Sequence, residues 1–342
     1  MSDLSRYQRQ IIFSELGVEG QRKLLAARVA VVGVGATGST IANWLARAGV
    51  GYIRLIDRDF VEYHNLHRQA LYDEEDVRSG LPKAVAAARK LQRVNSEITI
   101  EPVVADFNPD NALELTEDID LIMDGSDNFF TRYLINDVSL YKNIPWVYTG
   151  AIAAYGSSAT FIPHKGPCFR CIFETVPAPG TGETCETLGV LGPVVGVIAS
   201  FSAGEGMKVL TGMGVLNRGL VYFDMMANTW DVVEVEARPE CPACGQGKYE
   251  FLHAEAGTWA TRLCGSNSVQ ILTRGRHRID LYALAEKLRS NADVRDVRVN
   301  EYMLRFRVDG YEITVFPDAR ALIRGTGDVD LAKSLYARFV GY

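Results

Sequence analysis

Residues 28–57 have the pattern of a strand, a glycine-rich turn, a helix and a second strand. Residues 28–33 (RVAVVG) form a short β-branched run, and the stretch from Thr37 to Ala48 that follows is amphipathic. A second apolar run, Tyr52 to Ile56, ends at Asp57. About thirty residues is the length expected of a crossover between parallel strands, so this segment predicts a βαβ unit.

The alternation of strands and helices continues along the chain. The further elements expected in a first domain at residues 1–247 are a helix from Pro82, strands at 98–103, 120–123, 146–149 and 157–162, a helix at 194–211, and strands at 219–223 and 230–236. Repeated βα units favour a doubly wound, Rossmann-like and mainly parallel sheet, which is an α/β fold.

The second half of the chain contains a loop, a linker and a tail. Residues 177–196 are rich in Gly, Thr and Pro and predict a long crossing loop, and a linker is expected at residues 245–257. Short periodic runs beyond it predict a small α+β domain at residues 258–342, with strands at 269–272, 294–299, 303–308 and 311–316 and helices at 281–289 and 331–339.

Charge and composition exclude several classes of protein. The formal net charge is −6 and no run of Lys or Arg occurs, which argues against a nucleic-acid partner. The first residues, MSDLSRY, lack a basic head before an apolar run, so no signal peptide is expected. The longest apolar segment, residues 190–201, is too short and too interrupted to span a membrane. We therefore expect a soluble, cytoplasmic protein.

The glycine-rich turn indicates a bound nucleotide. Gly33, Gly35 and Gly38 follow a strand and open a helix, which is the context that a dinucleotide-binding fingerprint requires. Glycines let the backbone approach phosphates at the helix N-terminus, where unpaired N–H groups favour negative charge. Asp57 stands at the next strand end, where a carboxylate can accept hydrogen bonds from ribose hydroxyls. These residues alone leave open whether the nucleotide is NAD, FAD or another.

A second group of polar residues indicates a polyphosphate. Arg68 and Lys83 can neutralise charge that develops on a phosphate, while Asp127 and Asp59 can hold Mg²⁺, which prefers carboxylate oxygen. A hydride-transfer enzyme has no use for so many phosphate ligands. The alternative is that the two cations are solvated surface charges and that Asp127 caps a helix beginning near Phe129.

Four of the six cysteines form two Cys-x-x-Cys pairs, Cys168 with Cys171 and Cys241 with Cys244. Both pairs stand among turn-forming residues, and four thiolates suit tetrahedral Zn²⁺ in a closed, structural site. The alternative is two separate redox pairs, which we disfavour because neither pair is expected to open a helix after a strand.

The remaining two cysteines stand alone. Cys185 lies in the Gly/Thr-rich loop, where the neighbouring Glu183 and Glu186 argue against a permanently activated thiolate. Cys264 is expected to be a buried apolar cysteine.

Together these residues resemble the ThiF/MoeB/HesA family, the bacterial relatives of ubiquitin-activating enzymes. The resemblance extends from Arg6 to about Gly247 and includes Arg6-Tyr7-Gln8-Arg9-Gln10, the Gly33 to Gly38 turn, Asp57-x-Asp59, Asn65-Leu66-x-Arg68-Gln69, Pro82-Lys83, Ser126-Asp127-Asn128, both cysteine pairs and Thr184-Cys185. The tail, with Leu263-Cys264-Gly265, is similar to that of ThiF-type proteins from Gram-positive bacteria and has no rhodanese-like module. Ser126 replaces the family's usual Thr, and Ala36-Thr37 replace its Gly/Ala-Leu.

The resemblance implies an adenylyltransferase that uses ATP and Mg²⁺ to activate the C-terminal glycine of a ubiquitin-like sulfur-carrier protein. Arg68 and Lys83 would then bind the ATP phosphates, Asp127 the Mg²⁺ and Asp57 the ribose, and Arg9 would reach the triphosphate of the neighbouring subunit in a homodimer. Other residues of the matching motifs are expected to line the nucleotide site: Gly33, Gly35, Gly38, Asp59, Asn65, Gln69 and Asn128.

The resemblance leaves the role of Cys185 and the identity of the carrier open. The cysteine at this place forms a covalent link with the carrier in ThiF-like proteins, whereas it is dispensable in MoeB-like ones. A ThiS-like carrier for thiazole synthesis is the first expectation and a MoaD-like carrier for molybdopterin the second, because the same residues serve both.

Two further alternatives belong to other functional classes. An NAD-dependent oxidoreductase would leave Arg68, Lys83 and Asp127 without a role. A non-enzymatic scaffold that binds the carrier would retain ATP affinity without pyrophosphate exchange. The tail either recognises the carrier or covers an apolar face.

Overall fold

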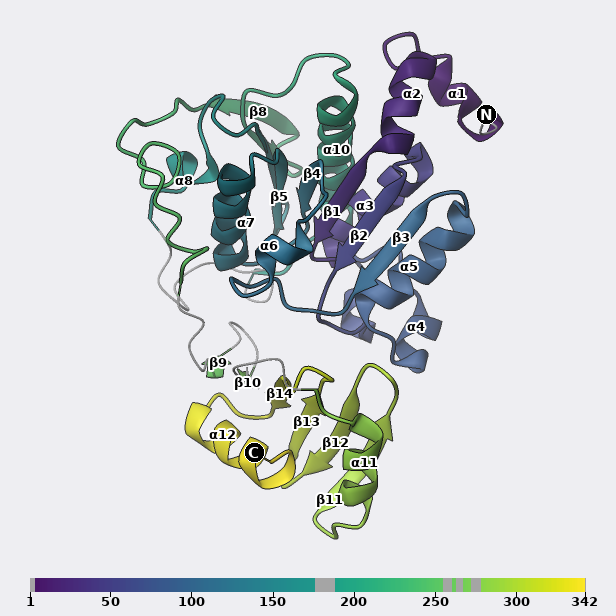
Figure 1. Ribbon diagram of the computed structural model, residues 1–342, viewed down its shortest axis with the longest axis vertical. Helices are drawn as coiled ribbons and strands as arrows, with labels where there is room; N and C mark the ends of the chain where they lie inside the picture. The colour runs from purple at the N-terminus through teal and green to yellow at the C-terminus, as the bar shows by residue number, and fades with distance from the viewer. Residues whose placement is uncertain (1–3, 176–187, 255–259, 263–266, 272–277, 342) are drawn as a thin grey trace. The chain divides into compact units, whose positions relative to one another are not determined.

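The computed structural model describes residues 4–175, 188–254, 260–262, 267–271 and 278–341. The chain divides into two compact units, and the larger one ends at Ala254 (Figure 1). The described part of the smaller unit begins at Ala260. Each unit has its own hydrophobic core.

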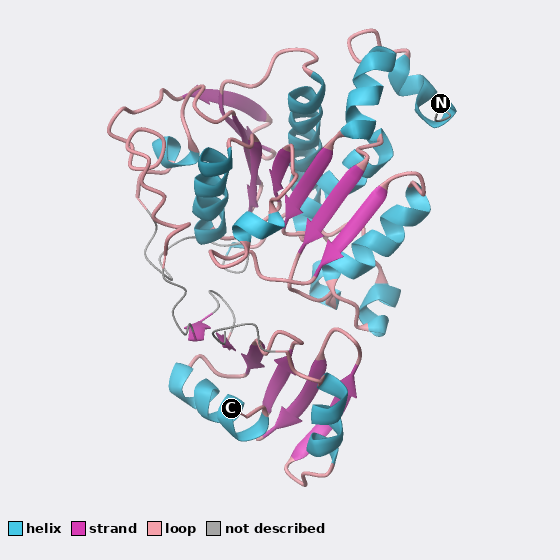
Figure 2. Ribbon diagram, viewed as in Figure 1, coloured by secondary structure: helices cyan, strands magenta, loops and turns pink. Residues whose placement is uncertain are grey.

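The larger unit is built on a sheet whose strands are magenta in Figure 2. The sheet has eight strands in the order β3-β2-β1-β4-β5-β6-β7-β8. The first five strands in this order are parallel, and the last three join antiparallel. The strands are β1 (Arg28–Val32), β2 (Tyr52–Ile56), β3 (Thr99–Val103), β4 (Leu121–Asp124), β5 (Trp146–Ile152), β6 (Tyr155–Phe161), β7 (Gly219–Asp224) and β8 (Thr229–Glu234). The predicted mainly parallel α/β sheet is confirmed.

Helices cover both faces of this sheet. They are α1 (Gln8–Ile11), α2 (Gly17–Ala26), α3 (Ala36–Ala48), α4 (Glu74–Ser79), α5 (Lys83–Val94), α6 (Ala112–Leu115), α7 (Phe129–Lys142), α8 (Phe169–Ile172) and α10 (Gly192–Thr211), with 3-10 turns η1 (Ser5–Tyr7) and η2 (Tyr63–Asn65). One core contains Ile41 of α3 and Leu91 of α5, and the other contains Tyr133 and Leu134 of α7. Four of the five β1 residues are buried, as expected of a strand covered on both faces.

Helix α10 is apolar along most of its length and packs against α3, β5 and β6. Among the described helices it alone is long and apolar enough to cross a membrane, but half of its apolar window is buried inside the protein. Burial of this kind is typical of a core helix.

The segment after the second cysteine pair belongs to the larger unit. The sequence predicts a linker at residues 245–257, but the backbone N–H groups of Phe251 and Leu252 donate to Asp137 of α7 at 2.8 and 3.3 Å. The ring of Phe251 also stacks on Tyr133 with a centroid distance of 4.7 Å. Because these contacts are buried, the chain leaves the larger unit only near Ala254.

The smaller unit is an antiparallel sheet with the strand order β11-β12-β13-β14-β10-β9. Its elements are β9 (Ala260–Arg262), β10 (Ser268–Ile271), α11 (Leu281–Arg289), β11 (Val294–Val299), β12 (Leu304–Val308), β13 (Tyr311–Val315), β14 (Ala321–Arg324) and α12 (Val329–Phe339). Both helices contribute to a single core with the inward side chains of the strands. The sequence did not predict β9 or β14.

Candidate functional site

The glycine loop, Gly33 to Gly38, connects the carboxyl end of β1 to α3. A Cβ atom on Gly38 would lie 1.9 Å from the carbonyl oxygen of Gly33, and one on Gly33 would lie 2.6 Å from that of Gly125. These two glycines therefore allow close backbone packing between the loop and the end of β4. A Cβ on Gly35 would meet only the Gln69 amide at 3.7 Å, so Gly35 is the position where a ligand can approach.

Asp57 shapes this loop from the end of β2. One oxygen of its buried carboxylate accepts from the N–H of Val34 at 2.7 Å, and the other accepts from the N–H of Asp59 at 2.7 Å. Burial raises the pKa of Asp57, and the nearby Lys83 opposes that shift. Both carboxylate oxygens of Asp57 thus accept a hydrogen bond from a backbone N–H group.

Lys83 begins α5 and directs its ammonium toward the same strand end. Its Nζ lies 3.4 Å from Oδ2 of Asp59, and the residue is 7% exposed. Burial alone would lower the pKa of Lys83, but the negative charges of Asp59, Asp57 and Asp127 outweigh it, so its pKa is raised. The amine therefore remains a cation at neutral pH.

Arg58 adds a second cation to this cluster. Its guanidinium lies 2.8 Å from Asp106 and 3.7 Å from Asp59. Burial opposes its charge, but Asp106, Asp59 and Asp127 together raise the pKa of Arg58. No specific role was expected for Arg58, although it stands between two predicted site residues.

Tyr72 connects the glycine loop to the helix of Lys83. Its hydroxyl lies 2.7 Å from the carbonyl oxygen of Val34 and 3.1 Å from that of Lys83, and the ring is buried. No motif in the sequence identified Tyr72, because its two partners are distant from it along the chain.

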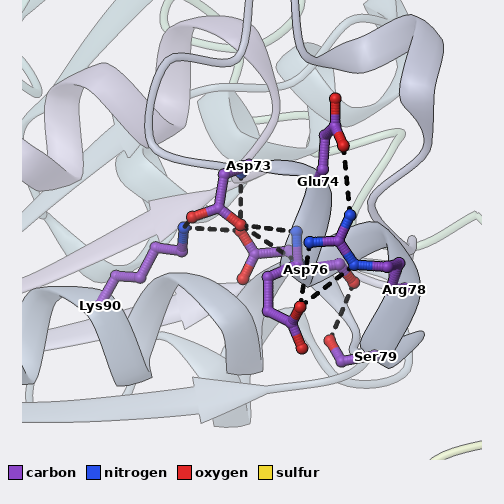
Figure 3. Close-up of polar contacts among 7 residues, drawn as sticks. Asp73, Glu74, Asp76, Arg78, Ser79 and Lys90 are labelled. Carbon is purple, nitrogen blue, oxygen red and sulfur yellow. Dashed lines mark hydrogen bonds and ion pairs between the residues drawn. The ribbon is translucent and has the colours of Figure 1, made fainter.

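A charged network fixes α4 against α5 (Figure 3). Lys90 Nζ lies 2.7 Å from Oδ2 of Asp76, and it also pairs with Asp73, whose side chain caps α4. Lys90 stands two helical turns after Lys83. The network therefore holds the helix that presents Lys83.

The Ser126-Asp127-Asn128 turn follows β4 and is held by a buried ion pair. Asp124 accepts from the Ser126 N–H at 2.9 Å, and Arg132 of α7 donates to Asp124 at 3.2 Å and to the Ser126 carbonyl at 2.8 Å. Asn128 caps α7 by accepting from the Thr131 N–H at 2.9 Å. The alternative that Asp127 caps this helix is therefore wrong, and Asp127 is exposed. The sequence missed both Asp124 and Arg132.

Arg68 and Gln69 follow the turn η2. The Arg68 guanidinium donates to the carbonyl of His64 at 2.7 Å, and no contact among the described residues brings it to Lys83 or Asp127. Gln69 is 3% exposed, and its Oε1 has no hydrogen-bond partner within the described part of the chain. The amide nitrogen Nε2 of Gln69 lies beside Gly35, so a hydrogen-bond donor faces the glycine loop.

Asn65 and the start of α10 complete this turn. Asn65 accepts from the N–H of Glu62 at 3.0 Å and so stabilises η2 itself. A Cβ on Gly192, the first residue of α10, would lie 2.7 Å from the carbonyl oxygen of His67. The positive end of this 20-residue helix therefore lies against the turn that carries Arg68.

Arg9 lies at the other end of the sheet. It is exposed on α1, two residues after Tyr7, which packs against Gly49 at the C-terminus of α3. Gly35 caps the opposite end of α3, about 20 Å away for a 13-residue helix. Arg9 is thus remote from the glycine loop of its own chain.

The four paired cysteines form one cluster. Their sulfur atoms all lie within 4.8 Å of one another, with 3.7 Å between Cys168 and Cys241 and 3.4 Å between Cys171 and Cys244. A tetrahedral ion with metal–sulfur bonds of about 2.3 Å needs sulfur separations of about 3.8 Å, so the four donors fit such an ion. Neither pair was expected to open a helix, but Cys168 directly precedes the short helix α8. The two pairs nevertheless form one cluster, which argues against two separate redox pairs.

Protonation of the cysteine cluster also depends on its surroundings. Burial, followed by the charges of the neighbouring thiols, raises the pKa of Cys168 far above its usual value. Burial and Cys171 similarly raise the pKa of Cys244 to about 12. A bound divalent cation reverses this preference, because it stabilises the thiolates. Cys185 and Cys264 lie outside the described residues.

Fold and site define a nucleotide-binding α/β protein in which cations and acids surround a glycine-rich turn. The chain belongs to the ThiF family, whose model matches residues 7–243. It is 39% identical to the "Sulfur carrier protein ThiS adenylyltransferase" of Bacillus subtilis (strain 168), over 98% of this chain and 99% of that protein. The family resemblance inferred from the motifs is confirmed.

Two other similarities cover only part of the chain. The Xenopus laevis protein "Adenylyltransferase and sulfurtransferase MOCS3" is 39% identical over 71% of this chain and 54% of its own length. The crystal structure of E. coli MccB with ATP has a TM-score of 0.62 at 24% identity, covers 71% of this chain and 75% of its own, and shows the shared fold.

Proposed function

We propose that this chain is an ATP-dependent adenylyltransferase that activates the C-terminal glycine carboxylate of a ubiquitin-like, ThiS-type sulfur-carrier protein. The observation that carries the proposal is the cluster of Lys83, Arg58 and Asp59 that follows the end of β2, where the neighbouring Asp57 binds the backbone of the glycine loop at Val34. Similarity to the Bacillus subtilis enzyme over nearly the whole chain supports the choice of substrate.

The proposed reaction joins the carrier's carboxylate to AMP. A carboxylate oxygen attacks the α-phosphorus of ATP, the bond to the β-phosphate oxygen breaks, and pyrophosphate leaves. The carboxylate is already ionised at neutral pH, so this step needs no general base. The chain contributes positioning and charge stabilisation, with the Lys83 ammonium held in place by Asp59 and by the α4–α5 network.

The acids divide into two roles in this proposal. Asp57 holds the backbone of Val34 and Asp59, whereas the Asp59 side chain is 54% exposed and Asp127 is also exposed. We therefore assign Mg²⁺ binding to Asp127 together with Asp59, while ribose recognition by Asp57 stays a prediction, because each of its carboxylate oxygens can accept a second hydrogen bond. Bound Mg²⁺ would neutralise the phosphate oxygens and orient the leaving pyrophosphate.

Zn²⁺ is the proposed occupant of the cysteine cluster. Four sulfur ligands leave no open position, so the metal would be structural. It would tie the turn before α8 to the segment that ends on Asp137, both of which pack on α7.

A homodimer would give Arg9 a role in binding the nucleotide of a second copy. Because Arg9 is about 20 Å of helix away from its own glycine loop, it could reach a triphosphate only on a second copy. Three apolar side chains near it, Ile12, Phe13 and Val18, are 64%, 53% and 43% exposed, which supports burial against a partner.

A MoaD-type carrier is the second candidate substrate, favoured by the similarity to MOCS3 over the larger unit. Membership of the ThiF family argues against the oxidoreductase alternative. We place the enzyme in the cytoplasm, consistent with four paired cysteines that form no disulfide. A covalent link between Cys185 and the carrier stays a prediction.

Carrier-dependent ATP–pyrophosphate exchange tests the proposal, with ThiS-type and MoaD-type carriers side by side. Arg68→Ala and Asp127→Ala should each abolish exchange while the far-ultraviolet circular dichroism stays unchanged. Arg47→Ala, near the end of α3 that is opposite the loop, and Asp231→Ala, on the edge strand β8, are exposed matched controls that should retain it. Normal exchange in both site variants, or no exchange with either carrier, would refute the assignment.

A further inference from the structure

Strands β4 and β5 separate from each other just before the candidate site. In the described part of the chain, β4 pairs with β5 only through Ile122 and Met123. After that point β4 continues beside β1, where the Gly125 N–H donates to the carbonyl of Val32 at 2.8 Å, whereas β5 runs on to Ile152 beside β6. Because buried backbone groups are almost always hydrogen-bonded, the two diverging strand ends need other partners.

A buried ion pair provides these partners. Asp124 accepts from the backbone N–H of Ser126 at 2.9 Å and also from the backbone N–H of Thr149 in β5. Arg132 of α7 donates to the carbonyl of Ser126 at 2.8 Å and to that of Thr149 at 3.4 Å. The carboxylate and the guanidinium, paired at 3.2 Å, therefore replace strand-to-strand hydrogen bonds between the ends of β4 and β5.

The guanidinium of Arg132 is enclosed by the protein. Arg132 is 8% exposed, and its guanidinium lies 5.6 Å from the ring centre of Phe129 and 5.0 Å from that of Tyr148. Burial opposes the charge of Arg132, but Tyr148, Asp124 and Asp127 together raise its pKa. A guanidinium enclosed in this way is not presented to a phosphate, so a role in the reaction has to pass through the residues that it holds.

Asp127 stands between two residues that are fixed in place. On one side, the ion pair binds both the N–H and the carbonyl of Ser126, whose hydroxyl also donates to Asp124 at 2.6 Å. On the other side, Asn128 caps α7. Asp127 itself is exposed, and its charge is close enough to contribute to the electrostatics of Arg132. The direction of the Asp127 carboxylate therefore depends on backbone that Arg132 and Asp124 hold.

We propose that Arg132 is a positioning residue for Asp127, an inference that rests on the Mg²⁺ role given to Asp127 in the proposed function. By holding the Ser126 carbonyl, Arg132 keeps the turn in one conformation, so the carboxylate of Asp127 is ordered before the metal binds. Residues that support a metal ligand in this way typically contribute about 10- to 100-fold to metal affinity. Lysine would keep the charge beside Asp124, but its ammonium lacks the planar fork that reaches a carboxylate and two carbonyls at once.

Binding of ATP to the full-length chain measures this contribution without any carrier. Isothermal titration with ATP is carried out once in Mg²⁺ and once in EDTA, and the ratio of the two affinities gives the Mg²⁺-dependent part. Arg132→Lys should lower the affinity in Mg²⁺ about tenfold and leave the affinity in EDTA unchanged. An equal loss under both conditions, as expected of a merely structural role, would overturn the inference, and so would the parental affinity in Mg²⁺.

Arg54→Lys is the matched control. The Arg54 side chain is 14% exposed, compared with 10% for Arg132, and it too is ion-paired, at 2.6 Å from Glu101. Its guanidinium also donates to a carbonyl, that of Leu115, which precedes β4 instead of following it. Both ATP affinities should therefore stay at the parental values in this variant. A fall in the Mg²⁺-dependent part as large as that of Arg132→Lys would overturn the specific role of Arg132.

A double-mutant cycle shows whether Arg132 acts through Asp127. Asp127→Asn should remove most of the Mg²⁺-dependent part by itself, and Arg132→Lys added to it should leave the ratio of affinities unchanged. Losses that multiply would overturn the inference. Ser126→Ala decides the question if thermal unfolding shows that Arg132→Lys does not fold. This variant removes one hydrogen bond to Asp124, so the affinity in Mg²⁺ should fall about threefold, and the parental value would count against Arg132.

The results for Arg132 are separable from those for the proposed function, because ATP binding requires no carrier. A parent chain that binds ATP in an Mg²⁺-dependent way but shows no exchange with either carrier refutes the enzyme assignment and leaves the role of Arg132 intact. Normal exchange, together with an Arg132→Lys chain that binds ATP like the parent, does the reverse. Equal ATP affinity of the parent in Mg²⁺ and in EDTA overturns both the metal role of Asp127 and the inference built on it.

Discussion

Replacing Gly38 with alanine tests whether the glycine loop is set by backbone packing. The added Cβ would lie 1.9 Å from the Gly33 carbonyl oxygen and 3.3 Å from the Gly125 Cα. An ordinary C···O contact is about 3.3 Å, so the loop has to move by about 1.4 Å. Both nearest obstacles are backbone, which cannot rotate away as a side chain could.

The expected cost is large for a single methyl group. Overpacking of this kind destabilises by about 3 kcal/mol, which corresponds to a fall in Tm of about 6–12 °C for the larger unit. Differential scanning calorimetry of the chain measures this change. ATP affinity, measured by isothermal titration, should fall at the same time because the displaced loop no longer presents Gly35.

Gly35→Ala is the matched variant, because its Cβ meets only the Gln69 amide, at 3.7 Å. We expect Gly35→Ala to lower the free energy of unfolding by about 1 kcal/mol, because alanine is a less favourable helix N-cap than glycine. Its loss of ATP affinity should be at least as large as that of Gly38→Ala. A Gly38→Ala chain that unfolds at the parental Tm, or a Gly35→Ala chain that is equally destabilised, would contradict the packing argument.

Two further perturbations test other parts of the larger unit. Burial raises the pKa of Asp137 to about 6 from 3.8, so its stabilising contribution is complete below about pH 4 and is lost as the pH rises through 6. Asn at this position stays neutral, so the free energy of unfolding of Asp137→Asn relative to that of the parent should rise by on the order of 2–3 kcal/mol between pH 4 and pH 8, as measured by calorimetry. A difference in unfolding free energy that stays constant across that range would show that the pKa of the Asp137 carboxyl is not raised. Metal analysis should find about one Zn²⁺ per chain, and its removal by a chelator, or Cys241→Ser, should lower the Tm of the larger unit; a metal-free chain with the parental Tm would exclude a structural metal.

Most regular elements followed from local periodicity. The strand at Tyr52–Ile56, the helix at Leu281–Arg289 and the strand at Val294–Val299 lie where the sequence places them. Short strands such as β14 were missed, since four residues give too little alternation to recognise. The expected linker was too long because residues 249–252 are held by contacts with α7, more than a hundred positions earlier in the chain.

The candidate site was only partly predictable. The glycine loop, Lys83 and the two cysteine pairs stand out by residue type and spacing, and the structure brings the four cysteines together. Tyr72 and Arg132 were invisible because their roles depend on partners supplied by other elements. Ribose binding by Asp57 stays a prediction, and only the structure shows that both of its oxygens also accept from backbone N–H groups.

Sequence alone determined the class of fold, the family and the grouping of the four paired cysteines, because each depends on residue types at short, fixed spacings. Tertiary structure decided which of two neighbouring acids points outward, which glycine leaves room for a ligand, and which side chains of the small sheet face its core. These outcomes depend on register and on contacts between distant segments. A local pattern cannot encode them, since the same residues on a strand shifted by one position would point to the opposite side.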